Sequence, residues 1–463
     1  MTKLKFDYNN MMSAMVGEEG FSDTDLISAK DKLALTATSV VSKKGTGWQE
    51  WTELPYMPKA EIDEIAETGH KIAKSASAWV VFGIGGSALG PLAVATSLLH
   101  LKHNDLPASK RNAPKLYVED NVDPERMNAL LDIIDLKTTY FNVITKSGET
   151  SETLSQFLII YDLLKDKLGA VEAKKRIIVT TTIGKGSLYT AAAKEGFKIY
   201  GVGAGVGGRF SVLCPVGLLT FAVMGIDIHA MLDGARKMTE RCLESDYTQN
   251  PALLTAHLMV EAYKKGKNIS VMMPYADSLR YMADFYCQLW GESLGKALDL
   301  NGKLVNVGQT PAKSLGVTDQ HSQVQLYTEG PYDKVVVFLA VEKFRSEAVI
   351  ADGCAGIGDF LKGRTMGELL EAERVATEFA LVKANRLNYT VTFPEVDAVT
   401  IGEFLTYLMW QTAYAGQLLN IDTFNQPGVE EGKLATFAML GRKGYEEKLK
   451  EIKSKPKNKK YLI

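Results

Sequence analysis

Residues 78–90 read AWVVFGIGGSALG, an apolar and partly β-branched run that ends in glycines and a serine. A short apolar run followed at once by glycines is typical of a buried strand that turns into a helix. The same order of strand and helix recurs as far as residue 202, and the clearest helical pattern lies at 151–168. This alternation predicts a parallel sheet covered by helices on both faces. Its strands are expected at 78–82, 116–118, 140–144, 176–181 and 198–202.

The alternation of strands and helices starts again in the second half of the chain. Strands are expected there at 268–273 and 334–340, and helices at 253–265, 278–298, 366–383 and 404–420. The predicted fold class is therefore α/β, with two units that each form an α-β-α sandwich around a parallel sheet. We predict four segments: an N-terminal extension at 1–45, the first unit at 46–245, the second at 246–430, and a C-terminal helix and tail at 431–463.

Composition excludes several classes of protein. The 53 Lys and Arg residues nearly balance the 55 Asp and Glu residues, which argues against a dedicated nucleic-acid binder. The four cysteines are too far apart for a CxxC metal or redox pair, so we expect reduced and mostly buried thiols. Residues 1–20 do not resemble a signal peptide, and the apolar stretch 210–226 is broken by Pro215 and glycines. We therefore expect a cytoplasmic protein with no membrane partner.

Three loops follow predicted strands of the first unit, at the edge of an open parallel sheet where ligands bind. They are GIGGSA at 83–88, TKSGETS at 145–151 and GAGVGGRFS at 203–211. The first and third contain dinucleotide-type glycine patterns. Neither is followed, some 20 residues later, by the strand-end acid that would bind the ribose of a nicotinamide cofactor. A nicotinamide-dependent dehydrogenase is thus a weaker alternative.

The loop at 145–151 carries the groups that bind a phosphate monoester. Thr145, Ser147, Thr150 and Ser151 supply hydroxyls, and Lys146 supplies a positive charge. The helix that begins at the end of this loop adds free backbone N–H groups. The alternative is that one of the last two hydroxyls only caps this helix. The neighbouring glycine and serine loop favours phosphate binding.

Four further residues could carry chemistry. Arg209 follows two glycines, which permit close approach to a ligand, and its permanent charge suits a developing oxyanion. Glu292 lies in an apolar helical context, where burial would raise the pKa of its carboxyl toward that of a useful base. The alternatives are a structural ion pair for Arg209 and an ion pair with Lys296 for Glu292. His321 and Lys433 cannot be told from structural residues by their local pattern.

Together these segments resemble one family, the phosphoglucose isomerases. The two longest matches are GVGGRFSVLCPVG at 205–217 and LLNIDTFNQPGVEEGK at 418–433. The resemblance runs from about residue 80 to residue 433 and implies two domains of the sugar-isomerase (SIS) type in a homodimer. Four shorter matches occur in order at 83–90, 145–153, 291–293 and 319–323.

The resemblance implies reversible isomerisation of D-glucose 6-phosphate and D-fructose 6-phosphate through a cis-enediol, in glycolysis and gluconeogenesis, with no metal or other cofactor. It makes Glu292 the base that moves a proton between C1 and C2, and Arg209 the charge that stabilises the enediolate. Lys433 and His321 would assist ring opening, with His321 reaching across from the partner subunit. Ser87, Thr145, Lys146, Ser147 and Thr150 would hold the phosphate, and Gly86, Gln288 and Gln426 would line the sugar.

The chain departs from the family pattern at a few positions. Thr145 stands where serine is common and keeps the hydroxyl, whereas Glu149 stands where many members have a neutral residue. A carboxylate beside a phosphate is unfavourable, so we expect Glu149 to point away from the loop. The alternative function is a non-catalytic regulator that binds sugar phosphates through SIS domains. Whether mannose 6-phosphate is also a substrate depends on the pocket near C2, which the sequence does not show.

Overall fold

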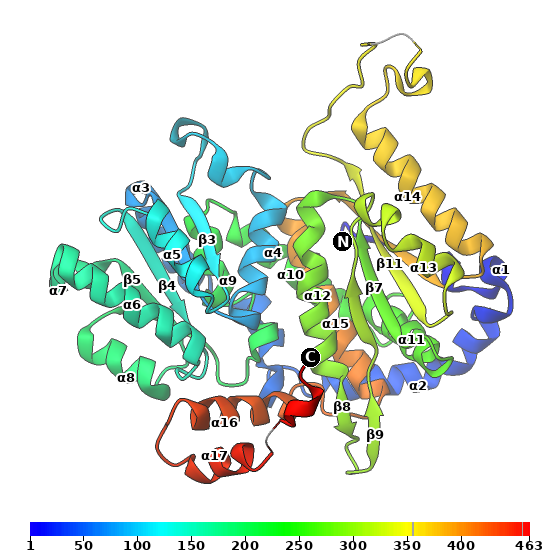
Figure 1. The fold of residues 1–463 in the computed structure, drawn as a ribbon. Coiled ribbons are helices and arrows are strands. Elements are labelled where there is room, and N and C mark those ends of the chain that lie inside the picture. Colours follow the sequence, from blue (N-terminus) through cyan, green and yellow to red (C-terminus); the bar gives the residue numbers. More distant parts are fainter. Residues whose placement is uncertain (354–355, 456) are drawn as a thin grey trace.

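The computed structural model describes residues 1–463 except 354–355 and 456. Two five-stranded sheets lie side by side, each with helices on its faces (Figure 1). The first has the strand order β3-β2-β4-β5-β6 and is wholly parallel. The second has the order β1-β12-β11-β7-β10, in which only β1 is antiparallel to its neighbour. The predicted α/β class with parallel sheets is confirmed.

The first sheet is buried on both faces, as its continuous apolar strands predict. Successive side chains of a strand point to opposite faces, so Val80 and Phe82 of β2 pack against α5, α6 and α8. Trp79 and Val81 point the other way, toward α3, α4 and α9. The strands are β2 (Ala78–Phe82), β3 (Lys115–Glu119), β4 (Thr139–Ile144), β5 (Ile177–Thr181) and β6 (Lys198–Gly201). The helices are α3 (Lys59–Ser75), α4 (Leu89–Leu98), α5 (Pro124–Ile133), α6 (Ser151–Leu168), α7 (Ala170–Lys175), α8 (Gly186–Glu195), α9 (Pro215–Val223) and α10 (Ile228–Cys242).

The second sheet is covered by α13 and α14 on one face and by α11, α12 and α15 on the other. α15 also packs along α10, so one continuous core joins the two units. A Cβ on Gly234 of α10 would lie 2.1 Å from the Val399 carbonyl oxygen, which shows how closely these helices approach. The strands are β1 (Lys5–Asp7), β7 (Ile269–Pro274), β10 (Thr310–Lys313), β11 (Lys334–Lys343) and β12 (Asn388–Glu395). The helices are α11 (Pro251–Lys264), α12 (Arg280–Leu294), α13 (Val324–Glu329), α14 (Met366–Lys383) and α15 (Ala398–Leu418).

Two features of the second unit differ from expectation. The segment 1–45, predicted as an extension, supplies β1 to the second sheet beside β12. The helix predicted at 278–298 ends at Leu294, because Gly295 has an extended backbone and the chain continues into β8. β8 (Lys296–Leu298) forms an antiparallel pair with β9 (Leu304–Val307).

The remaining helices lie near the two ends of the chain. They are α1 (Ser13–Val16), α2 (Asp23–Val41), α16 (Glu430–Met439) and α17 (Glu446–Lys453). Among the described residues, no helix combines the length and the apolar character needed to span a bilayer. Cys214 and Cys242 are buried free thiols and Cys287 is a partly buried one. Cys354, expected to be a reduced thiol as well, lies outside the described residues.

Candidate active site

The glycine loops of the first unit meet α12 of the second unit. A Cβ on Gly86 would lie 2.1 Å from the carbonyl oxygen of Gly208, so only glycine fits at this contact between the first and third loops. A Cβ on Gly85 would lie 2.9 Å from Nε2 of Gln288 on α12. Gly86 and the partly buried Ser87 thus lie in a short turn at the point where three segments converge.

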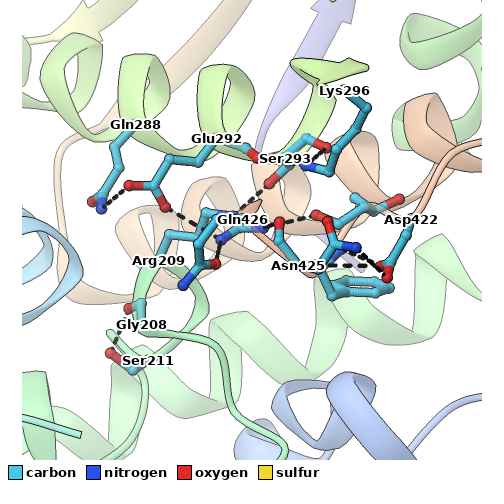
Figure 2. A network of polar contacts seen from close by, with 12 residues as sticks. Gly208, Arg209, Ser211, Gln288, Glu292, Ser293, Lys296, Asp422, Asn425 and Gln426 are labelled. Carbon is cyan, nitrogen blue, oxygen red and sulfur yellow. Dashed lines mark hydrogen bonds and ion pairs between the residues drawn. The ribbon is translucent and has the colours of Figure 1, made fainter. Parts of the chain in front are cut away.

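Arg209 lies where the glycine loops contact α12, and it is only 2% exposed. Its Nη1 donates to Oε2 of Glu292 at 3.2 Å and to Oε1 of Gln426 at 2.6 Å (Figure 2). Its Nε donates to Oγ of Ser293 at 2.7 Å, and its Nη2 to the carbonyl of Thr423 at 2.7 Å. The hydrogen bonds of one guanidinium therefore connect the third glycine loop with α12 and with the segment after α15.

The Glu292 carboxylate faces the same space and its side chain is 34% exposed. Its Oε1 accepts a hydrogen bond from Nε2 of Gln288 at 3.2 Å, while its Oε2 accepts the bond from Arg209. Lys296 does not pair with this carboxylate, contrary to one alternative from the sequence. The Lys296 ammonium instead binds the backbone carbonyls of Glu292 and Ser293, at 2.7 and 2.8 Å (Figure 2). The carboxylate is therefore held by two donors and partly open to solvent.

Three hydroxyls of the loop before α6 form a cluster. The Oγ1 atoms of Thr145 and Thr150 lie 2.6 Å apart, and Oγ of Ser147 lies 3.4 and 3.5 Å from them. The Thr150 side chain makes no capping bond to α6, so the alternative of a simple helix cap is not observed there. The free N–H groups of the first turn of α6 lie beside the cluster. This arrangement can hold an anion.

Lys146 reaches from this loop toward the third glycine loop. Its Nζ donates to the carbonyl of Ala204 at 2.8 Å and lies 4.3 Å from the centre of the Trp48 ring. Burial lowers the pKa of its ammonium to about 8, and the nearby Glu50 carboxylate opposes this shift. Glu50 also accepts a hydrogen bond from the N–H of Gly205 at 2.9 Å.

Trp48 and Glu50 were missed by the sequence analysis because they precede the first predicted strand. The sequence feature that could have indicated these residues is Trp48, a large aromatic residue next to a glycine. Its side chain is half exposed in the structure. Glu149 behaves as expected and points away from the hydroxyl cluster. Its carboxylate accepts from the N–H of Ser187 at 2.7 Å and pairs with Arg442 at 3.4 Å.

His321 and Lys433 lie apart from these groups. Lys433 is exposed on α16 and its Nζ pairs with Glu430 at 2.8 Å. His321 is exposed in a short 3-10 turn, and its imidazole makes no hydrogen bond or ion pair within the described part of the chain. The structure thus brings Arg209, Glu292, Gln288 and Gln426 together, but neither His321 nor Lys433 contacts them within one chain.

Comparison with known proteins agrees with this geometry. The sequence model of the phosphoglucose isomerase family matches residues 60–455. A glucose-6-phosphate isomerase of Carboxydothermus hydrogenoformans is 50% identical over 99% of each chain. One of Rubrobacter xylanophilus is 39% identical over 96% of this chain and 100% of its own. The crystal structure of a glucose-6-phosphate isomerase from Chlamydia trachomatis has the same fold, with a TM-score of 0.81 and 20% identity over 98% of this chain and 92% of that one. The chain therefore belongs to the phosphoglucose isomerase family.

Proposed function

We propose that this protein interconverts D-glucose 6-phosphate and D-fructose 6-phosphate through a cis-enediol, as a cytoplasmic enzyme of glycolysis and gluconeogenesis. The observation that carries the proposal is the contact between Arg209 and Glu292, whose Nη1 and Oε2 atoms lie 3.2 Å apart. An aldose–ketose transfer needs a base, a fixed positive charge and a remote anchor for the substrate. A non-catalytic regulator would need only the anchor, so we do not propose that alternative.

Glu292 is the base of the proposed reaction and moves one proton between C1 and C2. Gln288 donates to one of its oxygens and Arg209 to the other, which fixes the plane of the carboxylate. Each oxygen accepts through one lone pair and keeps another for the substrate proton. Arg209 is also placed to stabilise the negative charge that develops on the enediolate oxygen. Gly86 and Gln426 would line the sugar beside Gln288.

The phosphate group binds at the start of α6 in this proposal. The hydroxyls of Thr145, Ser147 and Thr150 donate to it, together with the free N–H groups of the helix. Lys146 would add a positive charge to this site and Ser87 a further hydroxyl. Binding energy from this anchor is remote from the reacting carbons and can be used to orient them.

The experiment that tests the function is a coupled assay with fructose 6-phosphate as substrate and EDTA present. Formation of glucose 6-phosphate that saturates with substrate would support both the isomerase and its independence of a divalent metal. Saturable binding of fructose 6-phosphate without turnover would contradict the proposal and favour the regulator. A fluorescence change on adding a reduced nicotinamide cofactor would favour the dehydrogenase instead.

Activity should depend on pH through Lys146. The pKa of its ammonium is lowered to about 8, so the charged form predominates below pH 8 and is lost as the pH rises through that value. The neutral amine no longer attracts a phosphate dianion. We expect KM for fructose 6-phosphate to rise about fivefold or more between pH 7 and pH 9.5, with a smaller change in kcat.

The matched control for this prediction is Lys146→Arg, whose charge persists over the whole range. Its KM should vary less with pH than that of the unchanged protein. A KM of the unchanged protein that stays constant from pH 7 to pH 9.5 would remove Lys146 from the phosphate site.

We also propose that the protein acts as a homodimer, in which the partner subunit's His321 completes each site and assists ring opening together with Lys433. The support is a set of exposed apolar side chains on the second unit, some on α14 and some in the chain between β11 and α14. Exposed apolar side chains that form one contiguous patch mark an interaction surface. The side chains in this set are Val349, Ile357, Phe360, Val375 and Phe379.

Complementation between two inactive variants tests this arrangement. Glu292→Gln lacks the base and His321→Asn lacks the imidazole, so each alone should have little activity. Co-expression should restore about a quarter of the wild-type activity, because half of randomly paired dimers are hybrids with one intact site. No gain over the separate variants would place His321 in its own chain's site or outside the reaction.

A further inference from the structure

The end of α12 is capped by a lysine side chain. Lys296 follows the helix at the start of β8, and its side chain turns back so that Nζ donates to the carbonyls of Glu292 and Ser293, at 2.7 and 2.8 Å (Figure 2). The last carbonyls of a helix have no partner within the helix, and a cation is favourable there. Lys296 is only 6% exposed, so this cap is formed inside the protein.

The two capped residues are those through which α12 meets Arg209. The Glu292 carboxylate accepts from Nη1 of Arg209, and Oγ of the fully buried Ser293 accepts from Nε at 2.7 Å. The ammonium thus binds the backbone of both residues, while the guanidinium binds both of their side chains. The position of the carboxylate and that of the guanidinium depend on the same turn of helix.

Stabilisation of the fold alone does not explain why Lys296 is buried, because its ammonium has no paired carboxylate among the described residues. No carboxylate lies within ion-pair distance of its Nζ in the described part of the chain. A buried ammonium without a paired carboxylate is costly to the folded state. Burial and the like charge of Arg209 lower the pKa of Lys296 to about 8, while Asp422 and Glu292 act against that shift.

We propose that Lys296 is a positioning residue for the isomerase reaction: by capping the carbonyls of Glu292 and Ser293 it fixes where the base and Arg209 stand relative to the sugar. This inference rests on the proposed function. A displacement of a catalytic group by about 1 Å can cost about 10²-fold in rate. The phosphate anchor lies on α6 of the other unit, so substrate binding should depend little on this cap.

The test compares Lys296→Met with Lys296→Arg and with Lys334→Met. Lys334 serves as the control because it is 4% exposed and also donates to a backbone carbonyl, that of Pro331. It pairs with Asp333 as well, and none of these contacts includes a site residue. For Lys296→Met we expect kcat for fructose 6-phosphate to fall about 30-fold and KM to stay within about threefold. Lys334→Met should keep kcat per folded molecule, and Lys296→Arg should recover part of the lost rate.

The pH profile separates positioning from loss of fold. In the unchanged protein kcat should fall a few-fold as the pH rises above 8, because the cap loses its charge and charge-assisted hydrogen bonds are about twice as strong as neutral ones. Lys296→Arg keeps its charge and should lose this alkaline fall. A kcat of Lys296→Met within twofold of wild type, or a loss matched by Lys334→Met, would overturn the proposal.

Hydrogen exchange provides a readout that does not depend on activity. Amides in peptides covering 288–296 should exchange faster in Lys296→Met than in wild type and Lys334→Met, because the last turn of α12 has lost its cap. Unchanged exchange there would also overturn the proposal. An inactive wild type that shows the expected exchange would instead refute the proposed function and leave the cap in place.

Discussion

Replacing Glu292 by glutamine should lower kcat for fructose 6-phosphate about 10³-fold and leave KM within about threefold. The change removes the base but preserves the shape of the side chain. The new amide oxygen can still accept from Arg209. The new amide N–H group meets Gln288, whose Oε1 is buried and has no hydrogen-bond partner among the described residues. Rotation of the Gln288 amide presents this oxygen as an acceptor, so the site keeps its hydrogen bonds.

The measurement is the coupled assay, together with exchange of the C2 proton of glucose 6-phosphate with deuterated solvent, followed by NMR. Both rates should fall together, because the same carboxylate performs the transfer and the exchange. Glu64→Gln is the matched control, since Glu64 is an exposed glutamate of α3 that pairs with Lys198 on the surface. A Glu292→Gln rate within tenfold of wild type would mean that another group is the base.

Local pattern was sufficient for elements that depend on few distant contacts. The strand expected at 78–82 and the helix expected at 151–168 have the bounds observed for β2 and α6. β1 could not be predicted in this way, because its three residues become a strand only by pairing with β12 near the other end of the chain. The helix predicted at 278–298 is longer than the observed one for a related reason. Its pattern continues past Gly295, but pairing of β8 with β9 takes those residues into a hairpin.

The same distinction between local pattern and distant contacts applies to the candidate site. Thr145, Ser147 and Thr150 lie within one loop, so their clustering followed from sequence spacing alone. The contact of Arg209 with Glu292 spans 83 residues and depends on how α12 packs against the first unit. The alternative to a catalytic role for Glu292 was an ion pair of its side chain with Lys296 at helical spacing. The structure places its ammonium on the backbone, because the helix has already ended at Leu294.

Replacing Arg209 by lysine should lower kcat/KM about 10²- to 10³-fold although the charge is retained. The guanidinium uses all three of its nitrogens, with bonds to Ser293, Glu292, Gln426 and the carbonyl of Thr423. An ammonium donates from a single point and cannot satisfy acceptors on α12 and on the segment after α15 at once. Burial of the unpaired acceptors would also lower the midpoint of thermal unfolding.

The measurements for Arg209→Lys are kcat and KM in the coupled assay and the thermal midpoint followed by circular dichroism. Arg280→Lys is the control, because Arg280 is half exposed and pairs with Asp277 on the surface. The loss of catalysis needs to be separated from the loss of stability, since a misfolded variant is also inactive. If Arg209 acts on the enediolate, kcat of the variant is already reduced at temperatures well below its unfolding transition, where it is folded. Fructose 6-phosphate still binds the folded variant and therefore raises its thermal midpoint. If activity falls only at temperatures where the variant unfolds, the guanidinium serves the fold, and the charge that stabilises the enediolate must come from another residue.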